Sequence, residues 1–200
     1  MNEASDDHLI NLQIANFQSI SKAQKNLLIV LMSYLGFVWI YAFSPASDAS
    51  IKILGLSLPT PDFWPITPAM LTVLTLGFIG TINAIGPVWA KLQSTATKAG
   101  LDFYDFDVQK NLLDYFTFLT LHPEKPLEDR KSRRFQLRHF LYPLVILASL
   151  YATSYSMRKL PSTCFYKTYS WGCIFVQVAF SIRIFWRALC RFSGIRQEHI

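Results

Sequence analysis

Residues 63–90 contain no charged side chain. From Pro68 onward this stretch is long enough, at a helical rise of about 1.5 Å per residue, to cross a hydrocarbon core about 30 Å thick. A water-soluble chain would need a large surrounding core to cover such a segment on every face, and a chain of 200 residues provides little of one. Residues 67–90 are therefore predicted to form a membrane-spanning helix.

The composition extends this prediction to the rest of the chain. Hydrophobic residues make up 52% and charged residues 16% of the sequence, and the mean hydropathy is +0.26. Soluble domains usually carry about 25% charged residues. The net charge of +6 fits either cytoplasmic loops that face anionic lipid or a surface for nucleic acid. The first interpretation is favoured because the charges separate apolar runs.

Three further apolar runs are predicted to span the membrane, at about 26–44, 140–157 and 168–192. The uncharged part of the last run, 168–182, covers only about 22 Å as a helix before Arg183. A re-entrant or surface helix is the alternative for that run. The predicted fold is an all-α integral membrane protein with four transmembrane helices.

Residues 1–26, 91–138 and 183–196 together contain 15 of the 19 lysines and arginines, and the two other connections contain 4. By the positive-inside rule, both termini are predicted to be cytosolic. The expected organisation is a cytosolic amphipathic segment, a first transmembrane hairpin with an interfacial arm, a cytosolic basic loop, a second transmembrane hairpin and a tail (residues 1–26, 27–92 with the arm at 45–66, 93–138, 139–192 and 193–200).

Four prolines within residues 45–66 argue against a continuous helix there, since proline removes a backbone donor. The segment IKILGLSL within this arm predicts either an amphipathic interfacial piece or a small β-hairpin. Aromatic residues at the ends of the first two spans are predicted to anchor the protein at the lipid–water interface. These residues are Trp39, Tyr41, Phe63 and Trp64.

The second span has a face of small residues, Gly77, Gly80 and Ala84, which would allow another helix to approach closely. Asn83 is the polar residue at depth in this span. It would either hydrogen-bond to a neighbouring helix, line a pore or hold an oligomer together. Pro87 is expected to kink or end the helix.

The long polar section 91–138 is predicted to contain a helix at about 103–121, followed by a basic cluster. That cluster is interpreted as a contact with lipid head groups or with a partner, and a nucleic-acid patch is the less favoured alternative. Its residues are Arg130, Lys131, Arg133, Arg134 and Arg138.

No sequence motif of a hydrolase, a nucleotide-binding loop or a zinc protease is present. The three cysteines and four histidines show no spacing typical of a metal site or a disulfide framework. No acidic side chain lies in a predicted span beside a histidine or lysine. The sequence is therefore interpreted as non-enzymatic, without a cofactor or a metal.

The passage IKILGLSLPTPDFWPITPAMLTVLTLGFI resembles a pattern from membrane modules of bacterial defence-type and pentapeptide-repeat proteins. In that pattern an apolar segment with a glycine ends in a proline, an aromatic residue follows, and a second proline opens the next span. The residues in these roles are Ile53, Leu54, Gly55, Leu56, Leu58, Pro59, Phe63 and Pro68. Pro61 and Pro65 are additional, and Lys52 replaces an apolar residue.

This resemblance implies a small multi-pass protein of the bacterial inner membrane, such as the membrane effector paired with a retron reverse transcriptase. Such an effector would be held silent by a partner protein or ribonucleoprotein, and its release would damage the membrane and cause abortive infection. It would act as a homo-oligomer in the lipid bilayer. The alternative is a non-enzymatic accessory subunit of a larger membrane transport or secretion complex.

Overall fold

The computed structural model describes residues 3–43, 51–53, 56–58, 60–98 and 137–193. These residues form four helices: α1 (Glu3–Phe43), α2 (Thr60–Lys98), α5 (Leu137–Lys159) and α6 (Cys164–Ser193). Each of the four contains a segment that is long and apolar enough to cross a membrane, as in a multi-pass membrane protein. The predicted helix at 103–121 and the basic residues 130–134 lie outside the described residues, and only the backbone of Arg138 is described, in α5.

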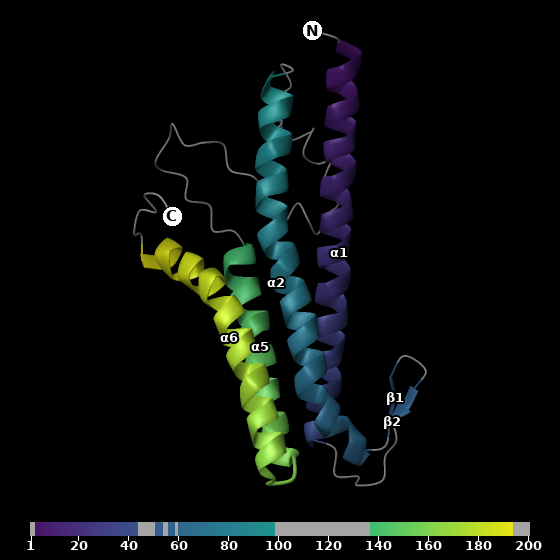
Figure 1. Ribbon diagram of the computed structural model, residues 1–200, viewed down its shortest axis with the longest axis vertical. Coiled ribbons are helices and arrows are strands. Elements are labelled where there is room, and N and C mark those ends of the chain that lie inside the picture. The colour runs from purple at the N-terminus through teal and green to yellow at the C-terminus, as the bar shows by residue number, and fades with distance from the viewer. Residues whose placement is uncertain (1–2, 44–50, 54–55, 59, 99–136, 194–200) are drawn as a thin grey trace. The chain divides into compact units, whose positions relative to one another are not determined.

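The arm between α1 and α2 contains two short strands, β1 (Ile51–Ile53) and β2 (Leu56–Leu58). They pair antiparallel, with Ile51 opposite Leu58 and Ile53 opposite Leu56 (Figure 1). The structure therefore has the β-hairpin that the alternating pattern offered as the second possibility. The described part of the chain is helical except for this hairpin and the short connection between α5 and α6.

The prediction that prolines exclude a helix up to residue 66 is wrong, because α2 begins at Thr60. Pro61 falls in the first turn, where a backbone N–H would have no partner inside the helix. Pro65 and Pro68 follow within two turns, and the first turns of α2 run at an angle to the rest of the helix (Figure 1). Missing backbone bonds at prolines are a known cause of such a bend. Pro87 does not end the helix, which continues to Lys98.

The N-terminal segment and the first predicted span form one continuous helix, α1, of 41 residues. At about 1.5 Å per residue its length is about twice the thickness of a hydrocarbon core. The last predicted span is also one continuous helix, α6, which runs through Arg183. A re-entrant pair of half-helices does not form there.

The chain divides into two compact units, and α1 and α2 contribute to both. Unit 1 contains residues 1–27 and 80–141, and unit 2 contains residues 28–79 and 142–200. In unit 1 the early part of α1 packs against the late part of α2 through one apolar cluster. Its buried members are Phe17, Ile85, Trp89, Leu92 and Ala96.

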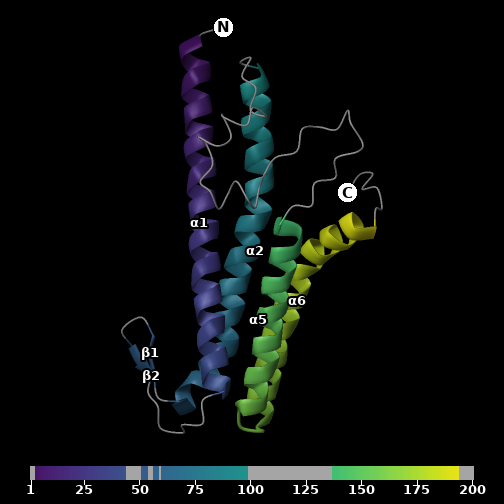
Figure 2. The ribbon, with the colours of Figure 1, turned by 180° about the vertical axis from the view of Figure 1, so that it is seen from behind.

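Unit 2 is built from the late part of α1, the early part of α2, and most of α5 and α6. Helices α5 and α6 lie side by side in both ribbon views (Figure 2). Large buried side chains from three helices fill its apolar core, including Leu31, Leu71 and Ile146. The rings of Phe78 and Tyr142 meet in a T-shaped arrangement, with ring centroids 5.3 Å apart. The polar groups described next lie among these helices.

Candidate functional site: a buried polar seam

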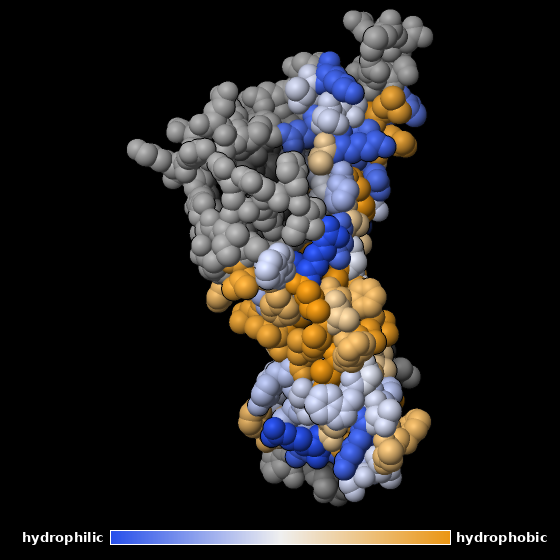
Figure 3. Space-filling view, turned by 60° about the vertical axis from the view of Figure 1, so that its left-hand side comes forward, coloured by the Kyte–Doolittle hydropathy of each residue, from blue (hydrophilic) through white to orange (hydrophobic). Residues whose placement is uncertain are grey.

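Unit 2 has apolar side chains on its outside and polar side chains on its inside. Val73, Leu147 and Phe175 are 66%, 52% and 73% exposed, whereas Gln177 and Ser149 are completely buried. Figure 3 shows the apolar surface of α5 and α6 as an orange band, with hydrophilic side chains near the α5–α6 connection. A water-soluble bundle has the opposite distribution.

Nine polar residues of unit 2 are buried in this way, and we refer to them together as the polar seam. They come from α2, α5 and α6, carry hydroxyl or amide groups, and include no charged side chain. The seam consists of Thr67, Thr72, Thr75, Ser149, Thr153, Ser156, Ser170, Gln177 and Ser181.

Gln177 of α6 joins the three helices of the seam. Its Nε2 donates hydrogen bonds to Thr72 Oγ1 on α2, at 2.9 Å, and to Thr153 Oγ1 on α5, at 3.1 Å. Its Oε1 accepts a longer bond from Ser149 Oγ, at 3.4 Å. The side-chain amide therefore uses both of its N–H donors and its oxygen, each toward a different hydroxyl group.

A second contact between helices lies next to this amide. The hydroxyls of Thr75 on α2 and Ser149 on α5 are 2.7 Å apart. Because Ser149 also bonds to Gln177, the chain of hydrogen bonds continues from α2 through α5 to α6. Bonds of this kind between helices contribute about 0.6 kcal/mol each in a membrane protein.

The remaining hydroxyls of the seam bond mainly to their own helices. Thr72 donates to the carbonyl oxygen of Pro68, Thr153 to that of Ser149, and Ser181 to that of Gln177, at 2.7, 2.9 and 2.5 Å. Ser156 and Thr67 make equivalent bonds one turn back along α5 and α2. These bonds allow hydroxyl groups to lie in an apolar environment without losing hydrogen bonding.

Ser170 is the exception in the seam. Its side chain is completely buried, and its hydroxyl oxygen has no hydrogen-bond partner among the described residues. Along α6 the seam extends from Ser170 to Ser181, about 17 Å at the helical rise. This is about half of a hydrocarbon core 30 Å thick.

The seam was not recognised from the sequence, because serine and threonine are common in apolar helices and none of these positions is charged. A signal was nevertheless present in the spacing. Ser149, Thr153 and Ser156 are four and three residues apart and therefore share one face of a helix. Gln177 is also the sole side-chain amide in α6. These two observations together indicate an inward polar face.

The small residues of α2 are divided between the two units. Gly77 is half-buried in unit 2, and Gly80, Asn83 and Ala84 belong to unit 1. Gly80 and Ala84 are exposed, and a Cβ atom built on Gly80 would have no neighbour within 4 Å. The Oδ1 atom of half-buried Asn83 is itself buried and has no hydrogen-bond partner within the described chain.

The four aromatic residues predicted as interfacial anchors lie in one aromatic cluster of unit 2. The rings of Tyr41 and Phe63 stack with centroids 4.2 Å apart, and the Trp64 ring meets Phe63 edge-on at 5.3 Å. The Trp39 ring stacks on Tyr151 at 5.5 Å. Tyr41, Phe63 and Trp64 are buried, so these side chains pack α1 against α2.

Within the described residues, no group of histidine, cysteine, aspartate or glutamate side chains is arranged to hold a metal ion. Two cysteines, Cys164 and Cys173, are free thiols. Among the described residues, the polar seam is the chemically distinctive group that the structure brings together. Comparison of the chain with protein-family models, with curated proteins and with solved structures finds no match.

Proposed function

We propose that this protein is a membrane-perturbing effector, and the polar seam is the observation that carries the proposal. Unit 2 would lie in the lipid, with its apolar exterior toward acyl chains and its hydroxyl and amide groups toward the bundle interior. Separation of α6 from α2 and α5 would break the hydrogen bonds of Gln177 and leave its amide and the hydroxyl groups open to water. Water entering there would cross about half of the hydrocarbon core along the seam, and association of several copies would complete a leak across the membrane.

The energies involved make such an opening accessible. Gln177 makes three hydrogen bonds to α2 and α5, and each contributes only about 0.6 kcal/mol in a membrane. Water that enters the seam replaces much of this loss with new hydrogen bonds. In the closed arrangement the polar groups of the seam other than Ser170 have hydrogen-bond partners within the protein. In the opened arrangement water would provide such partners.

Control by a partner follows from the resemblance of residues 51–79 to membrane effectors of bacterial antiviral systems. In this proposal the protein resides in the inner membrane with both termini in the cytosol. A partner protein or ribonucleoprotein holds the section 93–138, where the basic residues 130–138 would meet its phosphates. Release during infection would start association of several copies and the leak.

The test is induction of the full chain in cells that carry a dye sensitive to membrane potential. Wild-type protein should depolarise the membrane and stop growth. A variant with an apolar seam, Thr75→Val, Ser149→Ala and Gln177→Leu, should insert equally but leave the membrane polarised. Normal growth and full polarisation with the wild-type protein, alone and with its neighbouring genes, would reject the proposal.

A second candidate is a non-enzymatic accessory subunit of a larger membrane complex. Two observations favour it: apart from Ser170, the described seam hydroxyls are hydrogen-bonded as they stand, and the space beside Gly80 is open to another helix. Such a subunit would co-purify with a partner at fixed stoichiometry and would be harmless when overproduced. The depolarisation experiment therefore separates the two candidates.

A further inference from the structure

The polar seam determines what kind of solute a leak through unit 2 would carry. Each of its nine residues ends in a hydroxyl group or an amide, which offers both hydrogen-bond donors and acceptors. Pores that select cations are lined by carboxylates or carbonyl oxygens, and pores that select anions are lined by arginine or lysine. The seam contains neither a carboxylate nor a cationic side chain, and its one side-chain carbonyl oxygen, Gln177 Oε1, belongs to an amide that also carries N–H donors.

The charged side chains that the structure describes in unit 2 do not lie in the seam. Arg158, Lys159 and Lys167 are exposed near the α5–α6 connection, and Arg183 is exposed on α6. The Nζ atom of Lys159 lies over the Tyr155 ring, 5.7 Å from its centroid, in a cation–π contact. A path along Gln177 and its hydroxyl partners would therefore present a neutral wall to an ion.

We infer that the leak passes small monovalent ions of either sign, along a path that includes the Gln177 amide, which joins the three seam helices. This inference rests on the proposed function and adds its substrate class. Gln177 of α6 is the group that contacts both other seam helices, through Thr72 of α2 and through Ser149 and Thr153 of α5. A change in the charge of this one side chain should therefore change the selectivity of the whole path.

The experiment uses the full chain reconstituted in planar bilayers with a potassium chloride gradient. The expected reversal potential is near zero, which corresponds to a potassium-to-chloride permeability ratio of about one. Gln177→Glu should shift the reversal potential toward potassium at high pH, because the carboxylate is then ionised. Gln18→Glu makes the same chemical change at an exposed position of α1 in unit 1 and should leave the ratio unchanged.

The outcomes distinguish this inference from the proposed function. A wild-type conductance with strong preference for one sign would overturn the inference and leave the leak itself standing. An unchanged potassium-to-chloride permeability ratio in a Gln177→Glu protein that still conducts would also overturn the inference. Absence of any wild-type conductance would remove the proposed function, and the inference with it.

Discussion

At the scale of single residues, Gln177 links the helices of unit 2 more than any other described side chain. Gln177→Leu removes its bonds to Thr72, Thr153 and Ser149. Both threonines keep their bonds to their own helices, so the expected loss of stability is only about 1–2 kcal/mol. Unfolding by a denaturing detergent should show this loss, with Gln18→Leu as the exposed control.

The measured loss of stability tests this account of the Gln177 hydrogen bonds in two ways. A loss near zero would contradict the three hydrogen bonds. A loss well above the expected value would mean that the bonds of Thr72 and Thr153 to their own helices do not compensate for the missing amide.

Gly80 provides a second test at the scale of one residue. Gly80 is exposed and a Cβ atom built there meets nothing within 4 Å, so we expect the protomer to tolerate Gly80→Leu. If other copies pack on this face, the leucine should abolish the oligomer and leave membrane insertion intact. Gly36→Leu is the matched control, because Gly36 is also exposed with open space around it. Cross-linking of both variants in membranes is the measurement, and an unchanged oligomer in Gly80→Leu would show that the face is not used.

At the scale of helices, unit 1 depends on one aromatic contact between α1 and α2. Phe17 is completely buried, and its ring centroid lies 5.0 Å from that of Trp89. Phe17→Ala should cost about 3–5 kcal/mol of the packing of unit 1, if water surrounds that unit. Amide hydrogen exchange at residues 8–27 and 80–98 should become faster, and exchange in unit 2 should not change.

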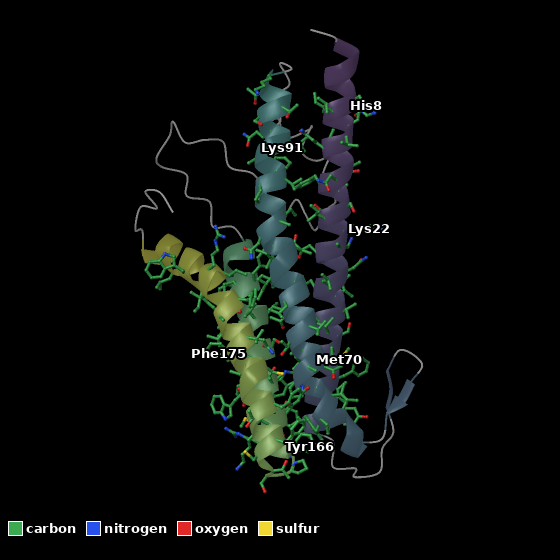
Figure 4. The ribbon with its side chains drawn as sticks, in the orientation of Figure 1. His8, Lys22, Met70, Lys91, Tyr166 and Phe175 are labelled. Atoms are coloured by element: carbon green, nitrogen blue, oxygen red, sulfur yellow. The ribbon has the colours of Figure 1, made fainter. Side chains whose placement is uncertain are left out.

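Leu12→Ala serves as the control for this experiment, since Leu12 is 60% exposed on the same helix. Equal protection in Phe17→Ala and the wild type would contradict a packing role for the cluster. Lys22 on α1 and Lys91 on α2, labelled in Figure 4, belong to the same unit, and both are exposed. Such exposed cations fit the expectation that unit 1 meets water or head groups.

The helices themselves were predictable, whereas their limits and their inner faces were not. Four apolar runs indicate four helices because apolar length is a strong signal. The start of α2 at Thr60 was missed because proline counts against a helix in general, yet is tolerated in a first turn. The continuity of α1 was missed because Lys22 and Lys25 look like a boundary, although a helix can cross it.

The candidate site was missed for a different physical reason. A serine or threonine that bonds to its own backbone costs little in an apolar helix, so each position is unremarkable alone. Thr72 and Gln177 become significant only where α2 and α6 pack together, and that pairing depends on contacts between distant parts of the chain. Trp39, Tyr41, Phe63 and Trp64 were predicted to lie at the lipid–water interface, and this stays a prediction. Their contacts with one another were not predicted.

At the scale of the whole molecule, the described surface favours lipid as the solvent of unit 2. Met70 and Phe175, labelled in Figure 4, lie on different helices and are both exposed. Without detergent the full chain should sediment with membranes and resist extraction by alkaline carbonate. Replacement of Val73, Leu147 and Phe175 by serine should weaken membrane retention, and a wild-type protein that stays monomeric in detergent-free buffer would contradict membrane insertion.

The proposed orientation can be tested with Cys164, which is a free and exposed thiol at the start of α6. If the N-terminus is cytosolic and all four helices cross, the α5–α6 connection lies on the opposite side of the membrane. In a Cys173→Ser, Cys190→Ser variant, an impermeant maleimide should label Cys164 in intact spheroplasts. With Cys164→Ser added, His8→Cys should be labelled only after lysis, because His8 is exposed near the N-terminus of α1. The reverse labelling pattern would mean that the topology is inverted. Labelling of both thiols from outside would mean that an even number of spans, and not three, separates residue 8 from Cys164.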